Sequence, residues 1–271
     1  MAGCRRGERV AKACGTMIVV ATVGTTHPLA FAGLTFAALT LAADAVRPVC
    51  ITAGVTAQDA ARVTARIPID PATIRAQFDA LHDVTIGAFH VGALLSAESV
   101  RAVAESLGAF PETPIVVDPV MAASGGDALA DDATRLALRD LLLPRATLVT
   151  PNLGEASALL GRTVADTAAM HEAATALTAL GAKAALVKGG HLSADPVDVL
   201  ADAQGLHEFR GTRIEASLRG TGDLLAVTIA AHLARGATLV EAIECARRHV
   251  RESIARGTDF AGTRVASLSG G

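Results

Sequence analysis

The chain has 271 residues, a length typical of one large α/β domain. Apolar residues make up 51% of it and charged residues 19%, which is enough apolar material for a buried core and excludes a wholly disordered protein. A net charge of −3 and an aromatic content of 3% leave neither a basic face nor stacking platforms, so no nucleic-acid partner is expected.

The N-terminal region holds an uncharged stretch, residues 14–43, that follows four basic residues. Such a stretch resembles a signal peptide or a membrane anchor. Gly24-Thr25-Thr26 and His27-Pro28 interrupt it, however, and favour a buried strand over 17–23 followed by a helix over 33–43. We therefore expect a cytoplasmic protein with no membrane partner. Residues 1–16 are predicted to be a disordered extension, with Met17 as a candidate start.

The rest of the chain alternates between apolar runs and helix signals. In chain order, the patterns predict a strand over 49–53, a polar stretch, a helix over 71–82, a strand over 85–89 and a helix over 96–107. They then predict a strand over 114–117, a helix over 131–143, a strand over 147–150, helices from 154 and over 168–181, and a strand over 184–188. Residues 197–200 and 206–210 predict a hairpin, and two long helices follow from Gly220.

This alternation predicts an α/β fold of three layers, with a central, mostly parallel sheet and helices on both faces. No internal repeat or low-complexity linker divides the chain. We therefore expect a single domain over residues 17–257 and a flexible tail over residues 258–271, which are rich in Gly, Ser and Thr. In such a sheet, ligands bind at the carboxyl ends of the strands, and here those ends carry most of the polar motifs.

The sharpest motif is Arg219-Gly220-Thr221-Gly222-Asp223, which begins a predicted apolar helix. Two glycines around a threonine let backbone N–H groups converge on one point, and the helix dipole adds to the attraction for an anion. Asp223 is then either the base that accepts a hydroxyl proton during phosphoryl transfer or an ordinary first-turn acid favoured by the dipole. The motif alone supports both interpretations equally.

Three further motifs precede this one along the chain. They are Asp118-Pro119-Val120-Met121, Pro151-Asn152-Leu153-Gly154-Glu155 and Lys188-Gly189-Gly190-His191. In this order and spacing, the four motifs together resemble the ribokinase-like superfamily, and most closely its hydroxymethylpyrimidine and phosphomethylpyrimidine kinases of thiamine biosynthesis. The resemblance covers about residues 18–256 and is most specific from Gln58 onward.

The resemblance implies a ribokinase-like fold with ATP and Mg²⁺ as cofactors. It implies that Asp223 is the catalytic base beside an anion hole made of Gly220, Thr221 and Gly222. The same resemblance implies that Asp118 and Glu155 organise Mg²⁺ and the phosphates, and that Lys188 and Asn152 belong to the nucleotide site. Carboxylates with retained water are what Mg²⁺ prefers.

The resemblance also implies an acceptor pocket for a small molecule. Gln58 matches an amide that reads the pyrimidine, because an amide offers both a donor and an acceptor. Val120 matches an apolar wall, and Gly24 belongs to the glycine-containing segment after the first strand. The implied reaction is ATP-dependent phosphorylation of hydroxymethylpyrimidine, of its monophosphate, or of both. Because the family is often dimeric, a homodimer is also implied.

Two positions depart from the family pattern. Asp223 stands where these kinases usually have Cys and where other members of the superfamily have Asp. Ala37 stands where the family has an acidic residue, so that side of the pocket is expected to be less polar. The departures keep two alternatives open: a related kinase for pyridoxal or a nucleoside, and a non-catalytic pyrimidine- or nucleotide-binding protein. His27, His90 and Arg219 are further candidates for the pocket, with structural roles as the alternative.

Overall fold

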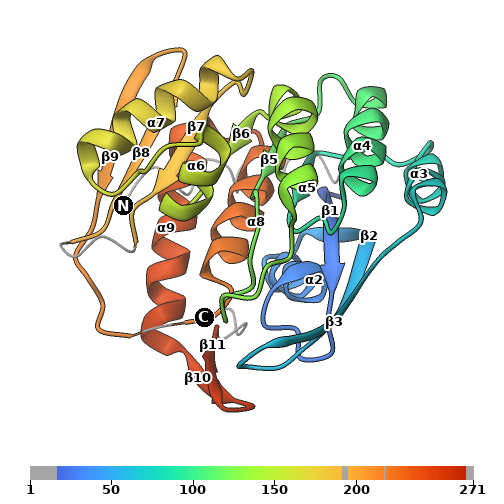
Figure 1. The fold of residues 1–271 in the computed structure, drawn as a ribbon, viewed down its shortest axis with the longest axis horizontal. Helices are drawn as coiled ribbons and strands as arrows, with labels where there is room; N and C mark the ends of the chain where they lie inside the picture. Colours follow the sequence, from blue (N-terminus) through green and yellow to red (C-terminus); the bar gives the residue numbers. More distant parts are fainter. Residues whose placement is uncertain (1–16, 191–194, 217, 267–271) are drawn as a thin grey trace.

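A computed structural model describes residues 17–190, 195–216 and 218–266 of the protein. A central sheet lies between two layers of helices, as the alternation of the sequence predicts (Figure 1). The expected disordered extension, residues 1–16, lies outside the described residues.

Nine strands form the sheet within the described residues, in the order β3-β2-β1-β4-β5-β6-β7-β8-β9. Strands β1, β2, β4, β5, β6 and β7 run parallel, whereas β3 at one edge and β8 and β9 at the other pair antiparallel. Their bounds are β1 Val19–Thr26, β2 Arg47–Gln58, β3 Val63–Pro68, β4 Ala88–Val91, β5 Ile115–Val117, β6 Leu148–Val149, β7 Ala185–Lys188, β8 Val197–Asp202 and β9 Gly205–Arg210.

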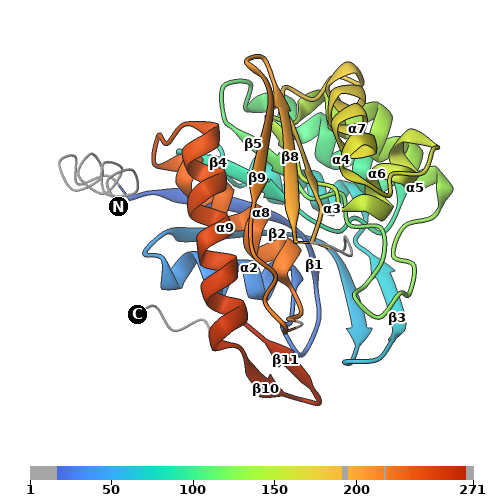
Figure 2. The same cartoon turned by 90° about the vertical axis from the view of Figure 1, so that its left-hand side faces the viewer.

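Two sets of helices cover the two faces (Figure 2). The larger set is α3 Pro71–Asp79, α4 Ala97–Ser106, α5 Asp132–Ala137, α6 Leu153–Leu160 and α7 Thr167–Ala179. Short turns of helix at 107–109 and 138–145 extend α4 and α5. The opposite set is α2 Gly33–Ala43, α8 Thr221–Ala234 and α9 Leu239–Arg256. The helices α2 and α3 begin at the residues that the sequence patterns predict.

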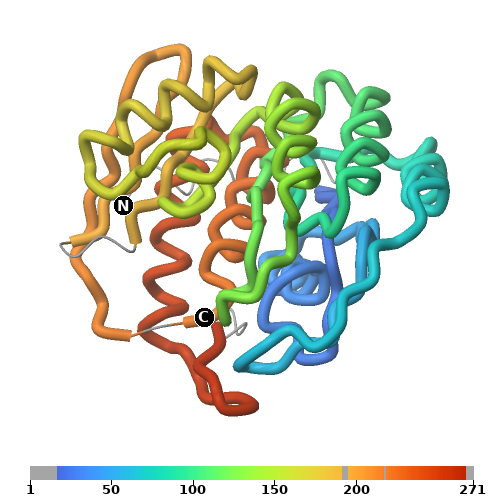
Figure 3. The backbone as a smooth tube through the Cα atoms, viewed as in Figure 1, coloured from blue at the N-terminus to red at the C-terminus, as the bar shows by residue number. Residues whose placement is uncertain are grey.

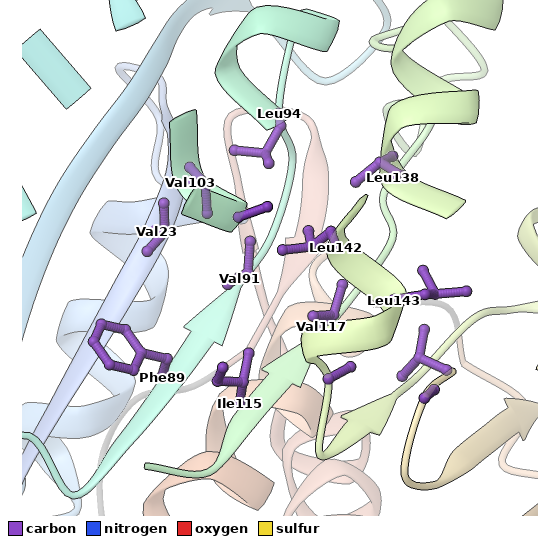
Figure 4. Packing of buried hydrophobic residues seen from close by; sticks show 14 of the residues in the cluster. Val23, Phe89, Val91, Leu94, Val103, Ile115, Val117, Leu138, Leu142 and Leu143 are labelled. Carbon is purple, nitrogen blue, oxygen red and sulfur yellow. The ribbon is translucent and has the colours of Figure 1, made fainter. Parts of the chain in front are cut away.

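Side chains along each strand point alternately to the two faces of the sheet, so the buried residues form one apolar cluster under each helix layer. Phe89, Val91 and Val117 pack with Val103 and Leu142 of the larger helix set, as Figure 4 shows. Their neighbours in sequence, such as Ala88 and Val116, pack instead against α2, α8 and α9. Since successive strand residues point to opposite faces, a polar residue at a strand end is directed to one layer or the other by its position alone.

Side-chain caps fix the starts of two of the predicted helices. The Asp70 carboxylate accepts hydrogen bonds from the backbone N–H groups of Ala72 and Thr73 at the start of α3. The Ser96 hydroxyl oxygen accepts one from the N–H of Ser99 at the start of α4. Side chains of this kind satisfy N–H groups that have no partner inside the helix.

Two elements differ from the expectations. The polar stretch after the second predicted strand contains β3, which pairs with the far end of β2. Its residues are exposed except for the half-buried Val63, so no buried face marks it in the sequence. The second is the region 258–271, expected to be a flexible tail, which contains strands in its first part. There β10 (Thr258–Phe260) and β11 (Thr263–Val265) form an antiparallel hairpin, and Ala266 beyond it is buried.

None of the described helices is long and apolar enough to cross a lipid bilayer.

Candidate active site

A buried ion pair joins the ends of β5 and β7. The Asp118 carboxylate is 2% exposed, and its Oδ1 accepts hydrogen bonds from Lys188 Nζ at 2.7 Å and from Thr150 Oγ1 at 3.0 Å. Burial alone would lower the pKa of Lys188, but the facing carboxylates of Asp118, Glu155 and Asp223 raise it above its usual value. The ammonium group therefore stays charged, which suits it to bind an anion.

A reciprocal cap places Glu155 beside this pair. The Asn152 Oδ1 accepts a hydrogen bond from the Glu155 N–H at 2.9 Å, and Glu155 Oε2 accepts one from the Asn152 N–H at 2.7 Å. The strand ends are also joined directly, because the Lys188 N–H donates to the Pro151 carbonyl at 2.8 Å. The Asn152 side chain thus caps the start of α6, while the Asn152 backbone N–H orients the Glu155 carboxylate.

The glycine loop at the start of α8 lies against the same ion pair. Gly220 has φ +78°, and a Cβ there would clash with the carbonyl oxygen of Phe31, so the position requires glycine. A Cβ on Gly222 would lie 3.2 Å from Asp118 Oδ2 and 3.3 Å from Lys188 Nζ. The first-turn N–H groups of Thr221, Gly222 and Asp223 have no acceptor inside the helix, so they are available to an anion beside Lys188, and we call this loop the anion cradle.

Asp223 has an altered protonation equilibrium. Desolvation raises its pKa to about 7, and the negative charge of Asp118 adds to the rise. The Gly33 N–H, which donates to Asp223 Oδ2 at 3.3 Å, and the charge of Lys188 act in the opposite direction. A carboxyl group with a pKa near neutrality is suited to general-base chemistry at physiological pH.

The pKa of Glu155 is raised as well. Desolvation raises its pKa to about 7, Lys188 opposes the rise, and the charges of Asp118 and Asp223 add to it. Three carboxylates therefore share one ammonium group at this point of the fold. Among the described residues no set of His, Cys, Asp and Glu forms a metal cage by itself. The excess of negative charge nevertheless suits a cation that brings its own phosphate and water ligands.

The predicted acceptor residues lie around the ends of β1, β2 and β5. Val120 packs on a small apolar cluster of Ala93, Leu95 and Leu129. Gly24 faces the same segment, since a Cβ there would lie 3.7 Å from the Ala93 carbonyl oxygen. Gln58 ends β2, and its cross-strand partner Val63 packs on that cluster too. The three residues predicted to bind the acceptor, Gln58, Val120 and Gly24, therefore lie near one apolar cluster in the fold.

Ala37 was expected to line the acceptor pocket, and it does not. Its side chain is fully buried in the apolar core between α2, the sheet and α8, together with Val20 and Leu41. It contributes no accessible surface to a pocket, so the absence of an acid at this position does not make a pocket wall less polar. The interpretation failed because an alignment gives the position on a helix without the face that the helix buries.

Two histidines are buried next to the site. His90 is 1% exposed, its Nδ1 lies 2.9 Å from Thr22 Oγ1, and burial lowers its pKa to about 4. A Cβ on Gly92 would touch both the His90 ring and Asp223 Oδ1, so both side chains lie close to Gly92. His27 is also buried, with its ring centroid 5.7 Å from that of Phe31, and burial lowers its pKa. Both rings are neutral at pH 7.

With this geometry established, comparisons identify the family. The sequence matches the phosphomethylpyrimidine kinase family over residues 31–266. The chain belongs to the phosphomethylpyrimidine kinase family. It is therefore a kinase, and the ribokinase-like arrangement of the sheet and its helices agrees with this assignment.

The similar proteins include hydroxymethylpyrimidine/phosphomethylpyrimidine kinases and pyridoxal kinases. The hydroxymethylpyrimidine/phosphomethylpyrimidine kinase of Streptomyces coelicolor is 39% identical over 210 residues, 77% of this chain and 78% of that protein. The thiamine biosynthesis bifunctional protein of Geobacter sulfurreducens is 41% identical over 202 residues, and the chain spans only 41% of its length. The ADP complex of Bacillus subtilis pyridoxal kinase has a TM-score of 0.86 and 28% identity, and the match covers 94% of this chain and 98% of that structure.

Proposed function

We propose that this protein transfers the γ-phosphoryl group of ATP to the hydroxymethyl group of hydroxymethylpyrimidine, to the phosphate of its monophosphate, or to both. The observation that carries the proposal is the position of the glycine loop. It places Gly222 against the Lys188–Asp118 pair and begins a helix whose first turn holds Asp223. An anion cradle, a fixed cation and a basic carboxylate are the groups that phosphoryl transfer to an alcohol requires.

Asp223 would accept the proton of the acceptor hydroxyl. Its pKa of about 7 leaves a large ionised fraction at neutral pH and makes the carboxylate basic enough to take up a proton as the new P–O bond forms. In a second phosphorylation the acceptor is already an anionic phosphate. That step needs little proton removal, so it would depend on alignment and on neutralisation of charge by Lys188 and the N–H groups of the loop.

Mg²⁺ and the ATP phosphates would lie between α6, β7 and α8. Glu155 is the best-placed metal ligand of this chain, because its carboxylate is crowded by two others, whereas Asp118 already pairs with Lys188. The metal would neutralise charge on the phosphates. Asn152 would hold the Glu155 carboxylate in place through its backbone N–H. Gly220, Thr221 and Gly222 would bind the transferred group through their N–H groups.

The acceptor would lie against Val120 and Gly24, with Gln58 reading its ring. A pyridoxal kinase is the second candidate, because Asp223 replaces the Cys usual in the pyrimidine kinases and solved pyridoxal kinases are among the structural neighbours. A cytoplasmic location and a homodimer belong to the proposal as well. Light scattering of the purified protein checks the dimer, and cell fractionation checks the location.

The test is a panel of acceptors assayed with ATP and Mg²⁺. The panel contains hydroxymethylpyrimidine, its monophosphate, pyridoxal and a nucleoside, with ATP turnover in the absence of an acceptor as the background. The proposal expects the highest kcat/KM with one of the two pyrimidines. Preference for pyridoxal would select the second candidate. Binding without turnover of any acceptor would identify a non-catalytic relative.

A further inference from the structure

The strand pair beside the candidate acceptor site forms a flap, residues 55–66, made of the end of β2, the turn 59–62 and the start of β3. Asp59 makes the turn tight, since its carboxylate accepts hydrogen bonds from the N–H groups of Ala61 and Arg62. Most residues of the flap are exposed. A segment with so little apolar burial is held in place by a few polar contacts and opens at low free-energy cost.

One side of the flap contacts the loop that follows β5. The Val63 N–H donates to Asp127 Oδ2 at 2.6 Å, and the Arg66 guanidinium donates to the Ala128 carbonyl. Gly125 lies against the turn so closely that a Cβ would be 2.5 Å from the Ala61 carbonyl oxygen. These contacts fix the turn against the segment that carries Val120.

The turn of the flap also contacts the side chain of Arg219. Its Nη2 donates to the Ala60 carbonyl in the turn, and its Nε donates to Thr263 Oγ1 at 3.2 Å. The guanidinium carbon lies 6.0 Å from the centroid of the Phe31 ring. One cation therefore links the flap, the C-terminal hairpin and the loop after β1. Figure 3 shows the β2–β3 turn and the hairpin at the same end of the molecule.

The backbone of Arg219 is equally constrained. Its N–H donates to the Arg264 carbonyl at 3.1 Å, and the next residue is Gly220, the left-handed start of the anion cradle. A movement of the Arg219 backbone therefore moves the cradle. The guanidinium already has a carbonyl, a hydroxyl and an aromatic face as partners, so it is directed to the flap and not to the cradle.

We propose that Arg219 is a positioning residue that latches the flap over the acceptor. The proposal rests on the proposed function, because Gln58, the ring-reading residue, ends β2 within the flap. The acceptor enters when the Arg219–Ala60 contact breaks, and re-formation of the contact returns Gln58 to the bound ring. Loss of the latch therefore weakens acceptor binding and leaves nucleotide binding unchanged.

Limited trypsin digestion tests the latch without reference to activity. Arg62 in the turn is a cleavage site, and mass spectrometry measures the rate of the cut after it. Arg219→Gln removes the charged donor, and we expect about tenfold faster cleavage after Arg62, the effect of losing a hydrogen bond to a charged group. Arg219→Lys, which keeps a donor and a charge, restores part of the protection. Arg101→Gln, at an exposed arginine on α4, is the matched control and leaves the rate unchanged.

Kinetics of the same variants give the second readout. Arg219→Gln is expected to raise KM for the preferred acceptor about tenfold and to leave KM for ATP within about twofold. Unchanged cleavage after Arg62 in a variant that keeps the wild-type Tm overturns the latch. A raised KM for ATP with unchanged cleavage also overturns it and places the guanidinium on the nucleotide. If no acceptor is phosphorylated, the proposed function fails, and the cleavage rate alone decides the latch.

Discussion

Substitution of Asp223 by Asn is expected to stabilise the folded protein while it removes activity. A carboxyl group with a pKa near 3.8 in the unfolded chain and about 7 in the fold binds its proton more tightly when folded. Stability therefore falls as the pH rises from about 4 to about 7 and is level above that range. Full conversion of the difference gives about 4 kcal/mol above pH 7. Because Asp223 keeps part of its surface in solvent, we expect about 1–2 kcal/mol.

Urea unfolding of the wild type and Asp223→Asn at pH 5, 6, 7 and 8 measures this effect. The variant is expected to gain stability relative to the wild type as the pH rises from 5 to 8, by about 1–2 kcal/mol. Asp79→Asn, at an exposed residue on α3, is the control and leaves the difference constant with pH. In the same preparations the variant should phosphorylate a free hydroxyl about a hundredfold to ten-thousandfold more slowly. Parallel stability curves for the wild type and Asp223→Asn would refute the desolvated carboxylate.

Three further substitutions test the proposed metal ligand, the proposed acceptor contact and the core. Glu155→Gln should raise the Mg²⁺ concentration needed for half-maximal rate and lower kcat, because a carboxylate beside the phosphates is lost; an unchanged Mg²⁺ titration would leave Glu155 as a helix cap only. Gln58→Leu keeps the size of the side chain but leaves polar atoms of the pyrimidine unpaired. It should lower kcat/KM for the pyrimidine about tenfold to a hundredfold at constant KM for ATP. Equal kcat/KM for the wild type and the variant in steady-state kinetics would contradict this contact. Ala37→Asp buries an unpaired carboxylate and should cost about 3 kcal/mol or more of unfolding free energy in urea, whereas Leu39→Asp, at an exposed position on α2, should cost far less; equal costs would show that residue 37 has access to solvent.

Prediction from the sequence was wrong or incomplete for segments without a buried face, and for a residue whose side-chain direction on its helix was not known. The strand β3 lies in a stretch that is exposed on both sides, so neither alternation nor an apolar run marks it. The two strands of the hairpin 258–265 pair with each other, and the hairpin meets the domain at residues far away along the chain. Arg219 forms a backbone bridge with Val265 and a side-chain hydrogen bond to Thr263, and the Phe260 ring packs on that of Phe31. Ala37 was assigned to a pocket because its position in a motif was known, but not the direction of its side chain.

The sequence by itself indicated most of the helices and strands and the candidate groups of the site. Buried strands, caps such as Asp70 and Asn152, and the Gly220–Asp223 motif are local patterns, and each acts within a few residues of the chain. Only the tertiary structure decided how those groups act. Asp118 and Lys188 are 70 residues apart, and Gly33 is 190 residues from Asp223. Their contacts exist because parallel strands end at one edge of the sheet and α8 begins there. The pKa values of Asp223 and Glu155 are raised by desolvation. In an extended chain both carboxylates would be hydrated, so only packing against the rest of the molecule creates this effect.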